Sequence, residues 1–370
     1  MQTISSKTIT LAAQNEQILS LNISAPNSHS LIEKQFEKQN FFENAKTLKM
    51  LFASTPFCHT LAWIQGFEHL FDMQLSSRSQ YVRVILCEGE RIIEHIATLG
   101  RIAKSVGLLP LFMKTQHIQQ KFEQFCLQLG IRKTIFIPGG TNIDFEPELV
   151  AKLLQFFEEI PAICNNIRST LLSSRIFKGR ATKTAYISAV NANALSLTGT
   201  VARASGITFD VRHSDDSKIY SKFPTIISRG GDAFTRTSIR LDEITQSLEI
   251  IKECSKNLPP EDISYKPNIV DSRNQRVFFA KEDMDSTLFD AGVYPIAHEY
   301  SAVEAPDGEF GIFLVGNGEC RLQRCKLNCP SFYAMQALEE ISVGEDPMDI
   351  ELIAASLGLT ISREAYVNAV

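Results

Sequence analysis

The sequence contains no apolar run that approaches the ~20 residues that a membrane-spanning helix needs. Its first residues, Met1 to Lys7, have neither the apolar core of a signal peptide nor the arginine-rich amphipathic pattern of an organellar presequence. These absences predict a chain that does not enter a bilayer by itself. We therefore expect any membrane association to come only through partner proteins.

Paired cysteines are also absent, because none of the eight cysteines forms a Cys-x-x-Cys motif. Scattered single thiols are typical of a protein in a reducing compartment. Cys320, Cys325 and Cys329 lie close together in the sequence, but no histidine accompanies them. We therefore expect no metal site in this chain.

The sequence also lacks an excess of basic residues. The chain has 370 residues, a formal net charge of −5 and a pI of about 5.9. Nucleic-acid binding favours a basic surface, so this balance argues against nucleic acid as a partner. Since 44% of the residues are hydrophobic and 21% are charged, the chain can bury a sizeable core, in one large domain or in two ordinary ones.

Residues 301–327 have the clearest local pattern in the chain. Proline presets φ in a turn, and glycine accepts the positive φ that other residues avoid. Three apolar strands separated by such turns predict a β-meander that can pack against a helical body. The strands are Ala302–Glu304, Gly311–Val315 and Arg321–Leu327, with turns at Pro306-Asp307-Gly308 and Gly316-Asn317-Gly318.

Helical periodicity dominates the middle of the chain. Helical segments are also predicted at Lys46–Asp72 and Thr115–Leu129, and a hairpin is predicted from Thr8–Ala12 and Ile18–Ile23. Two shorter helices are expected near the carboxyl end, over 330–341 and 347–357. The three longest predicted helices are Ser79–Val106, Pro147–Leu172 and Ala233–Lys256.

Together these elements predict an α+β fold that is mainly α-helical. A bundle of long helices is flanked by an N-terminal β-hairpin and a C-terminal β-meander. We divide the chain into an N-terminal hairpin region (1–45), a helical core (46–300), and a meander with C-terminal helices (301–370).

Several of these stretches closely resemble one family. The sequence is similar to the D subunit, or quinone-site large subunit, of respiratory complex I (NADH:quinone oxidoreductase), a relative of the nickel–iron hydrogenase large subunits. The resemblance runs from Thr8 to Leu357 and implies a hydrogenase large subunit-like fold. The matching stretches are Gln80–His95, Gly199–Arg212, Gly231–Ser247, Val303-Glu-Ala-Pro-Asp-Gly-Glu-Phe-Gly311 and Arg321-x-x-Arg324-Cys325-Lys326.

The matching stretches contain many charged residues. Glu88, Arg91 and His95 recur at i, i+3 and i+7, so they form a polar stripe on a mostly apolar helix. The stripe is either a wall beneath a redox site or an internal network that pins helices together, and the second reading is favoured. We expect these residues to be buried and paired with one another or with Arg236 or Arg240. The predicted polar core network is Arg83, Glu88, Arg91, His95, Arg203, Asp232, Arg236, Arg240, Glu243 and Glu304.

The positions at which the resembled family binds quinone differ in this chain. Counted back from the matching Glu68, the family's quinone-binding Tyr and its neighbouring Asp fall at Ala53 and Phe52. A family Arg falls at Ile137, and the family's His-Arg-Gly beside the terminal iron–sulfur cluster is replaced by Glu33-Lys34-Gln35. We predict that the usual quinone-binding residues are lost, and we identify no catalytic residue in this chain.

Two functions remain. Nickel–iron chemistry needs two Cys-x-x-Cys pairs, so hydrogenase activity is excluded. The first function is that of a peripheral-arm subunit in a complex I-type, proton-translocating NADH:quinone oxidoreductase of the respiratory chain. The alternative is a non-catalytic scaffold paralogue that bridges iron–sulfur subunits to a membrane arm.

The resemblance also implies partners and a location. We expect an iron–sulfur cluster subunit, a 30-kDa-type subunit and a membrane-arm subunit as neighbours. We expect no cofactor bound by this chain and an iron–sulfur cluster in a neighbouring subunit, and we leave quinone binding open. The expected location is peripheral on a membrane, at the matrix face of the mitochondrial inner membrane or the cytoplasmic face of a bacterial plasma membrane.

Overall fold

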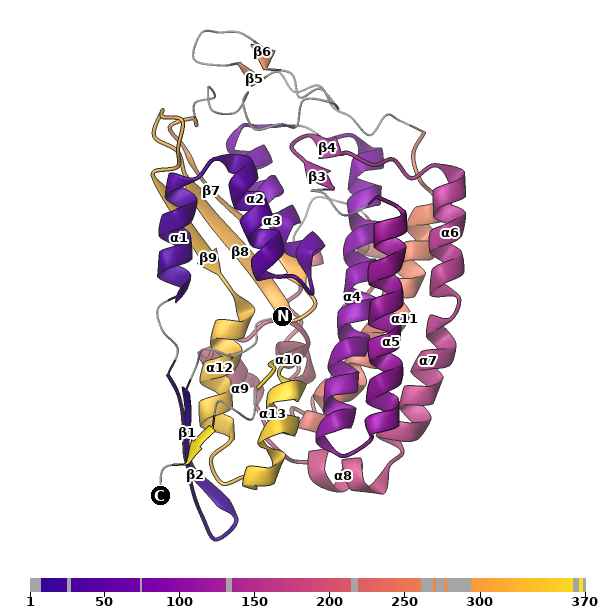
Figure 1. Ribbon diagram of the computed structural model, residues 1–370, viewed down its shortest axis with the longest axis vertical. Coiled ribbons are helices and arrows are strands. Elements are labelled where there is room, and N and C mark those ends of the chain that lie inside the picture. The colour runs from indigo at the N-terminus through magenta and orange to yellow at the C-terminus, as the bar shows by residue number, and fades with distance from the viewer. Residues whose placement is uncertain are drawn as a thin grey trace.

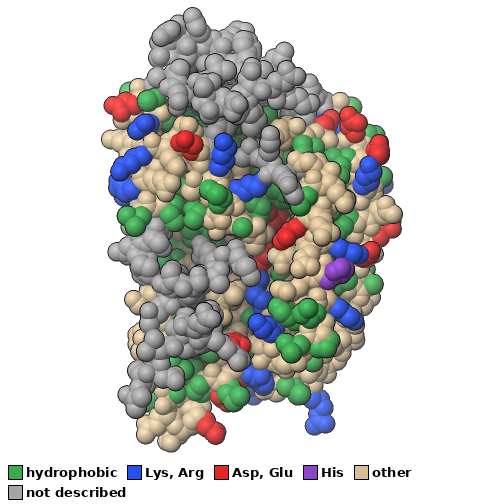
Figure 2. Space-filling view, in the orientation of Figure 1, with side chains coloured by type: hydrophobic (Ala, Val, Ile, Leu, Met, Phe, Trp, Pro, Cys, Tyr) green, Lys and Arg blue, Asp and Glu red, His purple; other side chains and the backbone are tan. Residues whose placement is uncertain are grey.

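The computed structural model describes residues 8–24, 28–73, 75–130, 135–213, 219–260, 269–270, 276–277, 294–361 and 366–368. The fold is α+β and mainly helical, as predicted: long helices stand beside a three-stranded meander, and a second small sheet lies at one end (Figure 1). None of the helices in these ranges is long and apolar enough to cross a membrane. Basic and acidic side chains are interspersed on the face shown in Figure 2.

Helix α4 (Ser77–Ser105) is the central element of the bundle. The side chain of Ser76 caps it by accepting a backbone hydrogen bond from its first turn. Helices α5 (Leu109–Gln128) and α11 (Ala233–Lys256) pack along it, and the Asp232 side chain caps α11. Because neighbours cover α4 on several sides, it buries charged residues as well as apolar ones.

Two of the predicted helices are interrupted. The predicted helix over 46–72 is two helices, α2 (Phe41–Leu51) and α3 (Pro56–Leu70), because Pro56 begins a new helix at its first position. The predicted helix over 147–172 is α6 (Pro147–Phe157), then α7 (Ile160–Ile167) and a π-helical turn. Shorter helices follow: α8 (Arg175–Ala181), α9 (Ala189–Ala194) and α10 (Gly199–Ala204).

The predicted meander forms from β7 (His298–Ala305), β8 (Gly308–Val315) and β9 (Arg324–Asn328), and α3 packs on it. The hairpin turn between β7 and β8 lies against Thr198. Gly308 has a φ of 131°, and a Cβ at this position would lie 2.6 Å from the Thr198 hydroxyl oxygen. Only glycine therefore lets this hairpin tip approach the helical body.

Helix α1 (Ser28–Lys38) covers the outer edge of β9. The Glu33 carboxylate accepts from the Leu327 backbone N–H at 3.1 Å, and the Glu37 carboxylate accepts from the Cys325 N–H at 3.4 Å. The two glutamates lie one helical turn apart, so they meet alternate residues of the strand. Part of the segment that replaces the family's His-Arg-Gly thus fixes a helix to the sheet.

The predicted N-terminal hairpin forms from β1 (Thr8–Gln14) and β2 (Gln17–Ser24). A third strand, β10 (Tyr366–Asn368), pairs with β1 in parallel and was not predicted. This sheet shares a second, smaller hydrophobic core with α12 (Pro330–Ile341) and α13 (Ile350–Ser356). The short segment 347–349 ahead of α13 is a 3-10 turn rather than the predicted α-helix. The other described elements are two 3-10 turns, Val211–His213 and Tyr220–Lys222, and four two-residue strands: β3 (Phe136–Ile137), β4 (Gly140–Thr141), β5 (Ile269–Val270) and β6 (Arg276–Val277).

Candidate functional site

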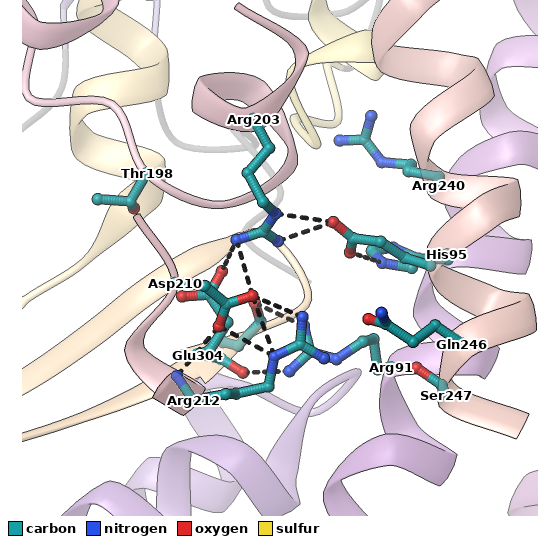
Figure 3. Close-up of polar contacts among 12 residues, drawn as sticks. Arg91, His95, Thr198, Arg203, Asp210, Arg212, Arg240, Gln246, Ser247 and Glu304 are labelled. Atoms are coloured by element: carbon teal, nitrogen blue, oxygen red, sulfur yellow. Dashed lines mark hydrogen bonds and ion pairs between the residues drawn. The ribbon is translucent and has the colours of Figure 1, made fainter. Parts of the chain in front are cut away.

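Many of the charged side chains of the fold meet in one buried network between α4, α10, α11 and β7 (Figure 3). Each member forms an ion pair or a charge-assisted hydrogen bond with another. We call it the core network, and it consists of Glu88, Arg91, His95, Arg203, Asp210, Arg212, Glu243 and Glu304.

Arg203 is the centre of the core network. Its Nη1 contacts Glu304 Oε1 at 2.6 Å and Asp210 Oδ2 at 3.5 Å, while its Nε donates to Glu243 Oε1 at 2.9 Å. Burial lowers the pKa of Arg203, but the carboxylates outweigh it and hold that pKa above its ordinary value. One guanidinium therefore ties the helical bundle to the meander.

Glu88 organises the other half of the core network. Its carboxylate contacts Arg91 Nε at 3.2 Å and Arg212 Nη1 at 3.3 Å, and it accepts from the hydroxyls of Tyr220 at 3.0 Å and Ser247 at 2.6 Å. Burial raises the pKa of Glu88, yet Arg91 and Arg212 lower it further, so the net pKa lies below the usual value. Glu88 is therefore an ionised, fully partnered carboxylate.

His95 joins the network through Glu243. The two side chains meet at 2.9 Å between His95 Nε2 and Glu243 Oε2. Burial lowers the pKa of His95 to about 4, so the ring is neutral at neutral pH and Nε2 donates to the carboxylate. Burial raises the pKa of Glu243, but Arg203 and His95 hold it well below its ordinary value.

The stripe was predicted to pair within itself or with Arg236 or Arg240, and the first of these is confirmed by the Glu88–Arg91 ion pair, whereas Arg236 and Arg240 are not partners of the stripe. Both arginines are buried on α11, but they donate to backbone carbonyls and to the Ser356 hydroxyl. They turn toward α13, whereas Glu243 turns toward α4. Burial lowers the pKa of Arg236 to about 9 and also lowers that of Arg240.

Two other predicted members lie outside the core network. Arg83 pairs with Glu68 at 2.6 Å and also donates to the carbonyls of Ile137 and Gly140, so it holds the 137–140 loop. Asp232 caps α11 and accepts from the Lys183 backbone N–H, so it fixes that helix start. The charged residues of the matching stretches thus have different structural roles: some form the core network, Arg83 holds a loop and Asp232 caps a helix.

Four partners were missed by sequence reasoning: Asp210, Arg212, Tyr220 and Ser247. The first two lie in the matching stretch Gly199–Arg212, so the resemblance itself could have placed them in the network. Tyr220 lies in a 3-10 turn, which leaves no periodic signal.

A cleft of about 620 Å³ opens above the core network. Arg91, Arg212 and Glu304 lie at the buried end, while Phe209 and Tyr300 are each 48% exposed at the rim. This volume is in the range of small-ligand sites. The lining residues are Leu61, Gln65, His69, Leu75, Gln80, Arg83, Val84, Cys87, Arg91, Phe209, Val211, Arg212, Tyr220, Tyr300, Ser301, Ala302, Val303, Glu304 and Glu309.

The positions that the resemblance assigns to quinone binding have apolar side chains. Phe52 is buried and stacks on His59, with ring centroids 3.8 Å apart and planes 10° apart, and it meets Phe310 at 5.1 Å. Ala53 is exposed, and Ile137 is half-buried. None of the side chains at 52, 53 and 137 can donate or accept a hydrogen bond.

A small cavity of about 40 Å³ lies beside Phe52, and we call it the Phe52 cavity. Its lining combines aromatic rings, including His59 of α3, with charged side chains from α4 and the β7–β8 turn. The lining residues are Phe52, Ser54, Thr55, His59, Glu94, Arg101, Ala305, Pro306, Asp307, Pro330, Ser331, Gly358, Leu359 and Thr360.

A metal centre is not visible in the part of the chain that the structure describes. There, no group of three or more His, Cys, Asp or Glu side chains could hold a metal ion. Of the clustered cysteines, Cys320 is exposed and Cys325 is buried, and both are free thiols.

Comparison with known proteins gives one consistent family. A family model described as "Respiratory-chain NADH dehydrogenase, 49 Kd subunit" matches residues 104–363. The D subunit of NADH-quinone oxidoreductase from Orientia tsutsugamushi (strain Ikeda) is 29% identical over 348 residues, which cover 90% of this chain and 87% of that protein. The D subunits from Rickettsia typhi and Rickettsia prowazekii are each 28% identical over 90% of this chain and 88% of their own length.

Proposed function

Because the chain belongs to the family of 49 kDa subunits of respiratory-chain NADH dehydrogenase, we propose that it is a peripheral-arm subunit of a complex I-type NADH:quinone oxidoreductase. The similar proteins are named as D subunits of NADH-quinone oxidoreductase, and the similarity to this chain extends over 87–88% of their length. The chain therefore works in respiratory electron transport as one part of a larger assembly.

The core network is the observation that carries this proposal. It joins α4, α10, α11 and β7 through residues of the same motifs that resemble the family. Removing one partner of a buried ion pair costs ~3–5 kcal/mol, so such a network persists only while the whole framework is kept. The framework that these motifs build is thus intact in this chain.

We infer that the chain's own quinone contacts have changed. A quinone carbonyl that faces Ala53, Phe52 and Ile137 finds no side-chain donor there. A carbonyl left unpaired in an apolar setting loses ~1–3 kcal/mol per group. Any quinone bound near these residues must therefore take its hydrogen bonds from other groups.

The expected neighbours are other subunits of the complex. We propose an iron–sulfur cluster subunit, a 30-kDa-type subunit and a membrane-arm subunit, with the cluster bound by the neighbour rather than by this chain. The chain then lies on a membrane only through these partners, at the matrix face of a mitochondrial inner membrane or the cytoplasmic face of a bacterial plasma membrane.

A second function is a scaffold that assembles the arm without taking part in quinone chemistry. The apolar side chains at the three family quinone positions favour it. In that case the core network would serve only to hold the bridge between neighbours rigid.

One experiment separates the two functions. The complex that contains this chain is purified, and its inhibitor-sensitive NADH:quinone reduction is measured with the native chain and with Ala53→Tyr. Ala53 is exposed, so the larger side chain has room. Full activity of the native complex, with a bound quinone hydrogen-bonded to this chain, would rule out the scaffold. No quinone reduction by a complex that still oxidises NADH would rule out the enzyme subunit.

A further inference from the structure

Asp307 lies at the tip of the β7–β8 hairpin and lines the Phe52 cavity. Its Oδ1 is shielded from solvent, and none of the described residues donates a hydrogen bond to it. Gly358 allows this placement, since a Cβ there would lie within van der Waals overlap of Oδ1. A buried carboxyl oxygen without a partner is costly, so a proton or a water molecule must satisfy it.

The charged groups that act on Asp307 come from two helices. Glu94 and Arg101 belong to α4, and Arg101 Nη2 donates to Glu94 Oε1 at 2.7 Å. Arg240 belongs to α11. Burial raises the pKa of Asp307 to about 6, Glu94 adds to the rise, and Arg240 and Arg101 oppose it. Asp307 is thus a carboxyl group that exchanges a proton close to neutral pH.

His59, which also lines the Phe52 cavity, is a neutral histidine. The Nδ1 of His59 lies 2.7 Å from the Thr55 carbonyl oxygen, so Nδ1 carries the hydrogen and Nε2 is left as an acceptor. Burial lowers the pKa of His59 to about 3, which keeps the ring uncharged. The cavity therefore pairs one group that can donate a proton, Asp307, with one that can accept a hydrogen bond.

The size of the Phe52 cavity decides what it can hold. Its 40 Å³ is close to the ~30 Å³ that one water molecule occupies in the liquid, and too small for a quinone ring. Arg101 Nε, like Asp307 Oδ1, is buried without a hydrogen-bond partner among the described residues. One water molecule in the cavity could donate a hydrogen bond to Asp307 Oδ1 and accept one from Arg101 Nε.

We propose that Asp307 delivers a proton, through one water in the Phe52 cavity, to a quinone reduced beside it, in place of the family's missing hydroxyl. This inference rests on the proposed function. An iron–sulfur cluster of a neighbouring subunit would supply the two electrons that reduce the quinone. The Asp307 O–H bond breaks, the water passes a proton to one quinone oxygen, and a second proton from solvent completes the quinol. The Asp307 carboxylate then regains its proton from solvent water.

The test is Asp307→Asn in the whole purified complex. Asparagine keeps the shape of the side chain but cannot release a proton. We expect inhibitor-sensitive NADH:quinone reduction to fall by ~10-fold or more, because a positioned proton donor contributes ~10²–10⁴-fold. NADH:ferricyanide reduction, which bypasses the quinone site, should stay unchanged. The matched control is Asp242→Asn, at an exposed ion pair with Arg168, which should leave both activities unchanged.

The pH profile is the readout that a structural role would not move. A donor must carry its proton, so native quinone reduction should fall as the pH rises through the pKa of Asp307, near 6. Asp307→Asn should lose this limb, and Asp307→Glu should keep it. If Asp307→Asn prevents assembly, the Asp307→Glu complex decides, and a flat profile there overturns the proposal.

Two outcomes separate this inference from the proposed function. Active native complex with an Asp307→Asn variant of equal rate and equal pH profile overturns the role of Asp307 alone. A native complex that reduces ferricyanide but no quinone overturns the enzyme subunit, and the role of Asp307 with it.

Discussion

The core network and the lining of the Phe52 cavity, which we call the Phe52 wall, belong to the same fold but differ in how their polar positions are occupied. In the core network, Arg203 and Glu88 are fully buried and each meets several groups of opposite charge. At the Phe52 wall, a family Asp position is an aromatic ring stacked on a neutral histidine. The first region is built from charges that partner one another, and the second has an aromatic ring at the position that the resemblance assigns to a family Asp.

This contrast separates two kinds of constraint. A charge in the core network is held by several partners, so a single change leaves the others buried and unpaired. A charge that serves only a ligand has no such partners in the chain and can be replaced by an apolar side chain with a gain in packing. Substitutions in each region in turn test whether the two regions differ in this way.

The largest effect should come from Arg203→Ala. The change leaves Glu304, Asp210 and Glu243 buried without their shared cation. We expect a loss of ~3–5 kcal/mol in the free energy of unfolding, measured by urea denaturation. A loss below ~1 kcal/mol, the size of an exposed pair, would mean that the core network is not what holds the meander to the bundle.

Phe52→Ala should rank next, through lost packing. Phe52 is buried against His59 and Phe310, and deleting a buried phenyl ring costs ~3–5 kcal/mol, with the lower end expected at a site beside an existing cavity. Phe52→Leu, which keeps most of the volume, is the matched control. Equal stability of native protein and Phe52→Ala would show that this wall is not part of the core.

The pH dependence of stability tests the neutral state of His95. Burial lowers its pKa from the ordinary 6.5 to about 4, so between these values the unfolded chain binds more protons than the folded one. Stability should therefore be fully present above pH 6.5 and fall as the pH drops toward about 4. His95→Gln still donates to Glu243 but does not titrate, so its thermal midpoint should fall less steeply over this window.

The smallest effect should come from Lys326→Ala. Its ammonium pairs with Glu33 at 2.7 Å, but the lysine side chain is about half exposed. Such pairs contribute ~0–1 kcal/mol, and Glu33 keeps its bond to the Leu327 N–H. A loss of several kcal/mol in the free energy of unfolding would mean that this half-exposed ion pair is as important for stability as the buried pairs of the core network.

Sequence alone predicted the elements that have strong local signals. The bounds of α11 and α12 follow from an Asp cap, a Cys-Pro start and helical periodicity, and the meander follows from its proline and glycine turns. The break between α2 and α3 was missed because the apolar spacing continues across 52–55, although Pro56 could have signalled it. The parallel strand β10 joins the two ends of the chain, and no local pattern encodes such a pairing.

The same limit holds for the candidate site. Burial of Glu88, Arg91 and His95 was predictable, since three polar residues on one helix face need partners. The pairing of Glu88 with Arg91 was also predicted. The partner of His95 on α11 was not, because Arg240 and Glu243 lie less than one turn apart on this helix and only the packing decides which of them faces α4. Asp307 looked like an ordinary turn residue, and its shielded oxygen follows from Gly358, which is far away in the sequence.

The glutamates of α1 have a consequence for how the chain is made. A strand such as β9 offers its outer backbone N–H groups to any other strand, which is a route to aggregation. Glu33 and Glu37 occupy two of these groups, and both residues leave the ribosome almost three hundred residues before the strand they cover. The cover is thus already synthesised when the exposed edge emerges, so the new sheet can be closed at once within its own chain, before another copy can pair with it.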